Sequence, residues 1–211
     1  MKNRRFVFGS TLISVIALIL MIPWLLQAHR EQQAVNALKS VGAVVEFDFQ
    51  AKRSKKPKYV PEWLRSFAGD CLFSNVHNVR VFDTPVTDSN LLPLADFPDL
   101  RHVLVKGNGV TDHTAHLLSR VPTIESVTFW DTLVTGKGLA EMARCSHLQS
   151  LSLLGASVSD GCLQALTEYS RLEHVQVARS RISSHGLESI SSIRSLRSID
   201  LWEAGTIDDK G

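Results

Sequence analysis

The chain has 211 residues, of which 44% are hydrophobic and 21% are charged, and its formal net charge is +2. A length of this order holds one ordinary domain with a small appendage. The near-neutral charge argues against a dedicated nucleic-acid-binding protein, because such proteins usually carry a clear basic excess. The three cysteines form no C-x-x-C pair and no zinc-spaced cluster with histidine. We therefore expect neither a nucleic-acid partner nor a metal site.

An apolar run without charged residues occupies residues 6–26, and three basic residues precede it. As a helix, these 21 residues rise about 30 Å, which matches the hydrocarbon core of a bilayer. The alternative is a cleaved secretory signal, whose apolar core usually has about 7–15 residues and ends at a small-residue cleavage site. The segment from Leu26 to Arg30 is a poor cleavage site. We therefore predict a single-pass transmembrane helix over 6–26, with the lipid bilayer as a partner and residues 1–5 as a short cytoplasmic N-terminus.

The orientation of this helix follows from the basic residues on its two sides. Three precede the span, and only Arg30 and Lys39 follow within about 18 residues, which favours repeats outside the cytoplasm. A basic cluster over 52–58 lies farther from the membrane than the rule usually considers, and including it reverses the preference. This cluster is either a solvated loop or a segment that attracts a membrane surface or a polyanion. The orientation stays open.

The segment between the span and the repeats predicts three short elements. Apolar spacing predicts a helix over 30–41 that ends at Gly42. Alternating apolar residues predict a strand over 45–49, and a proline followed by an amphipathic stretch predicts a second helix over 61–68. A repeat array needs a cap that covers its first unit. We therefore predict that residues 27–74 form a juxtamembrane helix and an N-terminal helix–strand–helix cap.

From Val76 onward the same apolar pattern recurs every 24 residues. The units start at Val76, Leu100, Ile124, Leu148, Leu172 and Leu196. In every full unit, apolar residues fill the first, fourth, sixth, eleventh, sixteenth and nineteenth positions. Such columns, in phase over five units, predict a repeat domain over 75–211 with five full units and one partial unit.

Each unit reads as one strand, one turn and one helix. The fourth and sixth residues alternate, so positions three to seven predict a strand with those two side chains inward. Positions twelve and thirteen are mostly Thr-Asp or Ser-Asp, which cap helix N-termini. Cys162 shares position fifteen with Gly138 and Gly186, which indicates a place for small residues. Because one unit cannot bury its own apolar face, stacking must supply the core, and the predicted fold is an α/β solenoid.

The pattern L-x-x-L-x-L-x-x-(T/N)-x-V-(T/S)-D-x-x-L-x-x-L resembles the leucine-rich repeat. It is most similar to the V-T-D-x-G-L variant of many bacterial repeat proteins, which is related to the cysteine-containing repeats of F-box proteins. With the span in front, the chain resembles bacterial membrane-anchored leucine-rich-repeat proteins. The resemblance covers residues 76–211 and implies a fold rather than a chemistry. The family usually has Asn or Cys at the ninth position, and Ala156 and Ala204 break that ladder.

The resemblance implies that partners bind to the concave face, to which positions three, five and seven point. The candidate binding residues there are Arg80, Phe82, His102, Lys106, Thr128, Trp130, Leu154, His174, Gln176, Asp200 and Trp202. Position seven forms an apolar strip that either contacts a partner or folds over the sheet edge. The sequence has no G-x-S-x-G, P-loop, H-E-x-x-H, G-x-G-x-x-G or EF-hand motif, so we expect no catalytic residues, no metal and no cofactor.

These observations predict a membrane-tethered binding module that recognises a protein, peptide or glycan through the concave face and is not an enzyme. The alternative is a cytoplasm-facing adaptor that recruits a protein partner, as the F-box relatives do. The chain ends at Gly211, midway through the sixth unit. Three explanations stay open: self-association covers this end, Trp202 and Ile207 fold over it, or the reading frame continues.

Overall fold

A computed structural model describes residues 4–48, 69–72, 74–82, 85–155 and 157–206, and for residues 4–20 it describes the helical backbone only. The strands within these residues are β1 (Val44–Phe47), β2 (Val76–Val81), β3 (His102–Lys106), β4 (Ser126–Trp130), β5 (Ser150–Leu154), β6 (His174–Ser183) and β7 (Ser198–Thr206). The α-helices are α1 (Arg4–Ser40), α4 (Asp88–Leu91), α5 (Asp112–Leu118), α6 (Gly136–Met142), α7 (Asp160–Ala165) and α8 (Ser184–Ile190). Three short 3-10 helices complete the order: η1 (Gly69–Leu72), η2 (Leu92–Asp96) and η3 (Leu166–Glu168).

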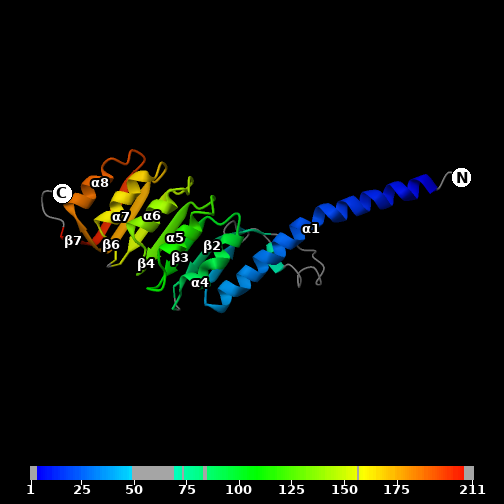
Figure 1. Ribbon diagram of the computed structural model, residues 1–211, viewed down its shortest axis with the longest axis horizontal. Coiled ribbons are helices and arrows are strands. Elements are labelled where there is room, and N and C mark those ends of the chain that lie inside the picture. Colours follow the sequence, from blue (N-terminus) through cyan, green and yellow to red (C-terminus); the bar gives the residue numbers. More distant parts are fainter. Residues whose placement is uncertain (1–3, 49–68, 73, 83–84, 156, 207–211) are drawn as a thin grey trace.

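The strands form one sheet in which spatial order follows chain order from β1 to β7 (Figure 1). β1 pairs antiparallel with β2, and all later neighbours are parallel. The register follows the repeat, because Val79 lies opposite Val103 and Val103 lies opposite Val127. The structure therefore confirms an α/β fold with a parallel sheet built from repeated units. Positions three to seven coincide with β3, β4 and β5, as predicted.

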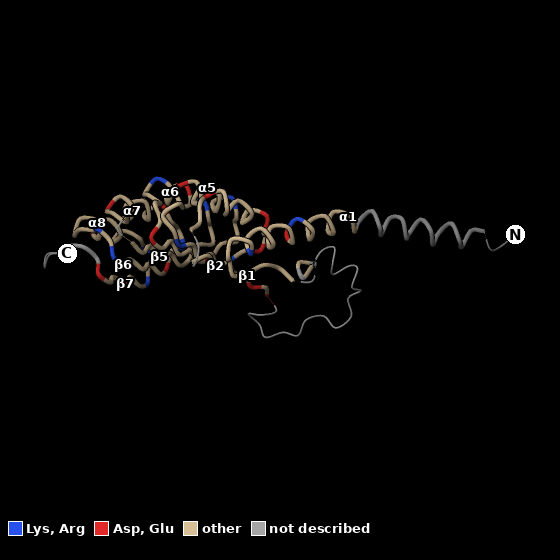
Figure 2. Tube along the Cα trace, turned by 90° about the horizontal axis from the view of Figure 1, so that it is seen from below, with Lys and Arg blue, Asp and Glu red and all other residues tan. Residues whose placement is uncertain are grey.

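The helices α4 to α8 lie in one row over a single face of the sheet (Figure 2). In the five full units, side chains at the fourth and sixth positions point toward them, as Val103 and Val105 do, and are at most 2% exposed, whereas Ile199 in the partial sixth unit is 38% exposed. The helical columns at positions sixteen and nineteen meet these side chains from the other side, for example Leu139 and Met142. One continuous apolar core therefore runs along the whole array, and the opposite face of the sheet is left open.

α1 is one continuous helix, whereas the sequence indicated separate helices over 6–26 and 30–41. No glycine separates those stretches, and helix formers connect them. Its C-terminal part buries Ala34, Val35 and Leu38 against η1, η2 and β1, so α1 and β1 cover the first repeat unit. Among the residues that the structure describes, no helix is both long and apolar enough to cross a membrane.

Several sequence expectations fall outside the described residues. They are the end of the predicted strand at Phe49, the basic cluster over 52–58, the helix over 61–68, Ile207, and the side chains of Ala156 and Ala204. The part of the predicted strand that is described behaves as expected, because Val45 and Phe47 are both buried.

Aspartates at position thirteen link three of the five full units to the next one. The pairs are Asp88 with Thr111, Asp112 with Thr135, and Asp160 with Ser183. At Asp160, Oδ1 accepts the Ser183 backbone N–H at 2.8 Å and Oδ2 accepts the Ser183 hydroxyl at 2.6 Å. These residues were expected to cap their own helices. The hydroxyl residue does begin its own helix, but the carboxylate reaches across the repeat boundary.

Position fifteen lies beside the aspartate of the preceding unit: two of these places hold glycine, and the third holds Thr114, whose hydroxyl donates to Asp88 Oδ1 at 2.6 Å. A Cβ added to Gly138 would lie 2.4 Å from Asp112 Oδ1, and one added to Gly186 would lie 2.4 Å from Asp160 Oδ1. Unit three has Gly136 in place of the aspartate, and the next unit then holds the buried Cys162 at position fifteen. The V-T-D-x-G-L pattern is therefore a contact between neighbouring units.

We predict that Gly138→Ala lowers the free energy of unfolding by about 1–3 kcal/mol, because the new methyl group must displace a carboxylate held by two hydrogen bonds. Gly161→Ala is the matched control, since its Cβ would meet only Ser159 Oγ at 3.9 Å. That variant should keep or raise stability, by up to about 1 kcal/mol. Urea unfolding of both variants measures this, and equal shifts in the two would contradict the contact.

Acid should weaken the links between units. Hydrogen bonds from Ser183 lower the pKa of Asp160, and at Asp88 hydrogen bonds from Thr111 and Thr114 outweigh burial and also lower the pKa. A carboxyl whose folded pKa is depressed stabilises the fold above its unfolded pKa of about 3.9, and this stabilisation is lost as pH falls through the folded pKa.

We therefore predict that Asp160→Asn lowers stability by about 1–3 kcal/mol at pH 7 and flattens the loss of stability below about pH 4. Unfolding midpoints measured from neutral to acid pH test this, with the exposed Glu168→Gln as the control. An Asp160→Asn profile that runs parallel to the wild type would show that this carboxylate does not link the units.

Candidate functional site

The face of the sheet turned away from α4–α8, called here the open face, carries the predicted binding residues. On β3, His102, Leu104 and Lys106 point to this face and are half-buried, while the two residues between them are buried in the core. The same alternation holds on β4 and β5. Three rows of side chains therefore cross the strands, named row three, row five and row seven after their positions in the unit.

Row seven lies at the carboxyl ends of the strands and is the most apolar row. Paired strands place its members side by side in the order Lys106, Trp130, Leu154, Ala178 and Trp202, and Phe82 follows directly after β2. Trp202 is 62% exposed and Phe82 is 38% exposed, so both reach solvent. Ala178 is only 3% exposed, although its position points to the open face. The row is thus a shallow apolar strip with large rings around a small residue.

Trp130 is the centre of this strip and carries a cation on either side. Lys106 Nζ lies 4.2 Å from the centroid of the indole ring, and Arg179 Cζ lies 5.8 Å from it. Such contacts stabilise by about 0.5–1 kcal/mol at exposed sites. The indole Nε1 is buried and has no hydrogen-bond partner among the described residues. The cluster therefore joins an apolar surface, two positive charges and an unused N–H donor.

Arg179 was not predicted from the sequence, and backbone geometry explains its place. Position eight needs a left-handed turn: Gly107 and Gly155 have φ of 144° and 136°, and Arg179 has φ of 49°. A residue with a side chain costs about 1–2 kcal/mol there relative to glycine. Asp131 and Glu203 adopt the same conformation at this position, with φ of 50° and 51°, and Arg179 is the cation among these three.

Rows three and five form a mostly polar surface, called here the polar floor. Toward β7 its side chains hydrogen-bond to one another. The Ser152 hydroxyl donates to Gln176 Oε1 at 3.2 Å, and Gln176 Nε2 donates to Asp200 Oδ2 at 3.5 Å. His174 Nδ1 and Ser198 Oγ are 2.7 Å apart. Thr128 is half-buried in the same floor. A ligand on this floor would therefore replace some of these side-chain hydrogen bonds with its own.

The β2 end of the open face is held by β1. Glu46 forms an ion pair with Arg80 and accepts a hydrogen bond from Asn78 Nδ2 at 2.9 Å. His102 packs beside the ring of His77 with centroids 6.0 Å apart, and burial is the main cause that lowers the pKa of His102. Arg80 and His102 are therefore engaged within the fold. The sequence did not reveal Glu46 as their neighbour, because this depends on the antiparallel pairing of β1.

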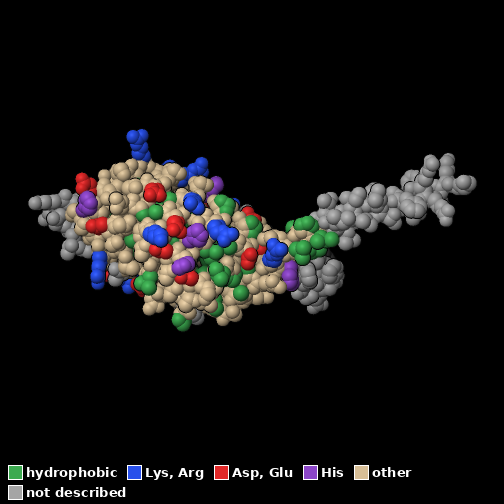
Figure 3. All heavy atoms as spheres, viewed as in Figure 1, with side chains coloured by type: hydrophobic (Ala, Val, Ile, Leu, Met, Phe, Trp, Pro, Cys, Tyr) green, Lys and Arg blue, Asp and Glu red, His purple; other side chains and the backbone are tan. Residues whose placement is uncertain are grey.

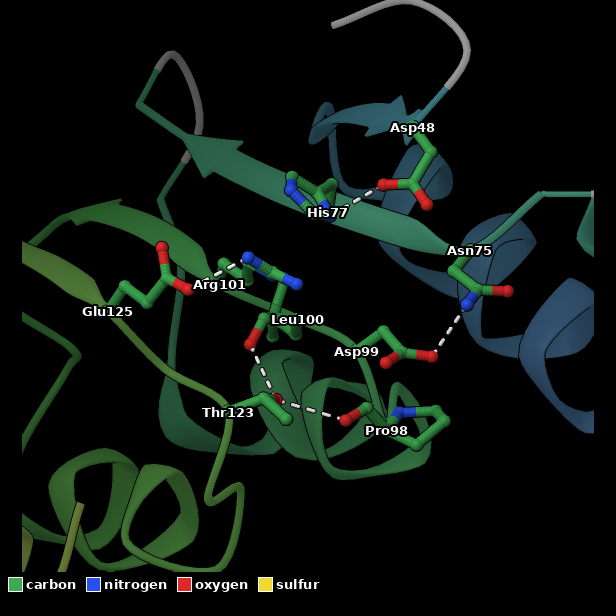
Figure 4. Close-up of polar contacts among 9 residues, drawn as sticks. All are labelled: Asp48, Asn75, His77, Pro98, Asp99, Leu100, Arg101, Thr123 and Glu125. Atoms are coloured by element: carbon green, nitrogen blue, oxygen red, sulfur yellow. Dashed lines mark hydrogen bonds and ion pairs between the residues drawn. The ribbon is translucent and has the colours of Figure 1, made fainter. Parts of the chain in front are cut away.

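A second polar surface follows the amino ends of the strands (Figure 4). Asn75 Nδ2 donates to Asp99 Oδ2 at 2.6 Å, and Arg101 pairs with Glu125 at 2.9 Å. The Thr123 hydroxyl lies 2.9 Å from two carbonyl oxygens of the preceding loop. At this edge, side-chain hydrogen bonds and an ion pair thus link neighbouring units, in addition to the backbone hydrogen bonds between the strands.

Within the described part of the chain, no group of three or more His, Cys, Asp or Glu side chains is placed to hold a metal ion. His113 and His116, both on α5, are exposed. His116 Nδ1 lies 2.9 Å from Glu141 Oε2, and His113 Nδ1 lies 3.2 Å from the Thr111 hydroxyl. Both rings are therefore occupied by neighbouring side chains.

Strand pairing places Lys106, Trp130 and Leu154 side by side, and Arg179 also lies against Trp130. Trp202 lies farther along the row, beside Ala178. Phe82, Arg80 and His102 lie toward the other end of the sheet. Chemically, the assembled strip can cover an apolar group and attract a negative charge. No protein-family model matches this chain, and neither does any curated protein. A functional interpretation therefore starts from this geometry.

Proposed function

We propose that the chain is a leucine-rich-repeat solenoid that acts as a non-enzymatic binding module and holds a protein, peptide or glycan against its open face. The observation that carries this proposal is row seven, where the half-buried Trp130 ring stands beside two cations and Trp202, farther along the row, is exposed. Aromatic and arginine side chains dominate the energetics of protein interfaces. The repeat spacing of 24 residues, with its strand and helix in each unit, supports the solenoid assignment.

The partner group that fits row seven has an apolar body and a negative charge. The apolar body covers the strip between Trp130 and Trp202, above the small Ala178. The charge lies near Lys106 and Arg179, where the Trp130 N–H also lacks an acceptor. Because that N–H is buried, the two cations rather than this donor would meet the charge. Rows three and five then supply exchangeable hydrogen bonds.

The tether belongs to the same proposal. Residues 6–26 contain no charged residue, and the described end of that run has Met21, Ile22, Trp24 and Leu26 each about half exposed. These apolar side chains gather where α1 leads away from the repeats (Figure 3). A helix that is apolar on all sides is stable in lipid or against a partner rather than in water. We place this segment in a bilayer, with the repeats outside the cytoplasm.

We predict that Trp130→Ala and Trp202→Ala each weaken binding of an open-face ligand by about tenfold or more, because buried aromatic anchors contribute about 2 kcal/mol. A displayed random peptide library and a glycan array, both probed with the full chain, would supply the ligand. Leu92→Ala is the control, since Leu92 is 60% exposed on η2 and lies off the open face. Unchanged affinity in both tryptophan variants, with intact melting temperatures, would remove the strip from the site.

For the tether, the full chain should remain in the membrane pellet after an alkaline carbonate wash, and a variant lacking residues 1–26 should move to the supernatant. A reporter enzyme active only outside the cytoplasm, fused after Gly211, should be active. A pelleted but inactive fusion would instead favour the cytoplasm-facing adaptor. Full-length chain in the supernatant would contradict the tether itself.

A further inference from the structure

A hollow of about 490 Å³ lies at the amino ends of β6 and β7, on the edge opposite row seven. Its polar wall contains Ser170, Arg171, Glu173, Arg194, Ser195 and Arg197. Within the described wall, the three arginines face a single acidic residue. Like charges gathered around one hollow repel one another, so the site favours an anion.

The arginines differ in how far they are engaged. Arg197 Nε lies 3.0 Å from Glu173 Oε2, and this pair is the one ion pair found in the described wall. Arg171 and Arg194 are exposed and have no acidic partner among the described residues. The backbone N–H groups of Glu173 and Arg197 are already used, because both donate to the preceding unit. The side-chain donors offered to a ligand are guanidinium and hydroxyl groups.

The same crevice occurs two units earlier and is electrically balanced there. Its wall has Arg101, Thr123, Glu125 and His147, and its volume is about 160 Å³. Arg101 pairs with Glu125 at 2.9 Å, so its one arginine meets its one glutamate. The backbone at the two crevices is equivalent by the repeat. The excess positive charge of the later hollow is thus a property of its side chains and is not required by the fold.

We propose that this hollow binds a phosphoryl group carrying two negative charges, on a small polar molecule. The planar guanidinium forks of Arg171 and Arg194 match the oxygens of such a group, and Ser170 and Ser195 add hydroxyl donors. The volume lies within the range of about 300–1,000 Å³ typical of small-molecule sites. Among the described residues, no aromatic side chain lines the hollow, so the phosphoryl group itself carries recognition. This site is independent of row seven.

Calorimetric titration of the full chain in a non-ionic detergent, with pyrophosphate at constant ionic strength, tests the site. We expect saturable binding, with Kd raised about tenfold or more by Arg171→Gln and by Arg194→Gln, because each removes charged hydrogen bonds. Arg194→Lys should weaken binding less than Arg194→Gln, since it keeps the charge. Both arginines are exposed, so their variants should keep the wild-type melting temperature.

The matched control is Arg101→Gln, which removes the same charge from the balanced crevice and should leave Kd unchanged. Equal weakening by Arg101→Gln and Arg194→Gln would overturn the proposal, because attraction would then reflect overall charge. Absence of saturable pyrophosphate binding would also overturn it. Inorganic phosphate and acetate are titrated in the same way, and equal affinity for the two would overturn the assignment of a phosphoryl group.

Discussion

Each strand–helix unit of this chain must dock on its neighbours in one register, because alone it cannot bury its apolar side. On the sheet side, backbone ladders between residues 24 positions apart fix that register. On the helix side, the carboxylate of Asp112 accepts hydrogen bonds from the backbone N–H and the hydroxyl of Thr135 in the next unit. At the three boundaries that have such an aspartate, two separate sets of hydrogen bonds therefore hold the units, with the core between them.

The repeat columns predicted the strands and the helix starts well, since burial of periodic apolar residues leaves little choice of face. The role of Asp112 was harder to see. Aspartate after threonine suits a local cap as well as a contact across units, so local preference does not separate the two. Glu46 and Arg179 were missed for a related reason. Their partners depend on the pairing of β1 and on a left-handed turn in a unit distant from Trp130, and neither is a local property.

The fold constrains inward positions far more than outward ones. Inward columns stay apolar in every full unit, whereas rows three, five and seven change from serine to histidine to tryptophan along the array. A backbone that repeats thus serves as a fixed frame for side chains that do not. Some outward residues, such as Trp130 on row seven or Arg194 at the opposite edge, differ from the residues at the same position in most other units. Stacking of the units does not require these side chains. The candidate sites follow from these differences.

The two candidate sites lie at opposite ends of β6. The unit that begins at Leu172 supplies Arg179 at the carboxyl end of the strand and Glu173 at the amino end. Six residues of extended strand separate them by about 20 Å. The Debye length at physiological ionic strength is about 8 Å, so exposed charges at one edge are largely screened from the other. Coupling between the edges would need movement of β6, which ladders to β5 and β7 restrain. The array can therefore carry distinct chemistry on its two edges without one disturbing the other.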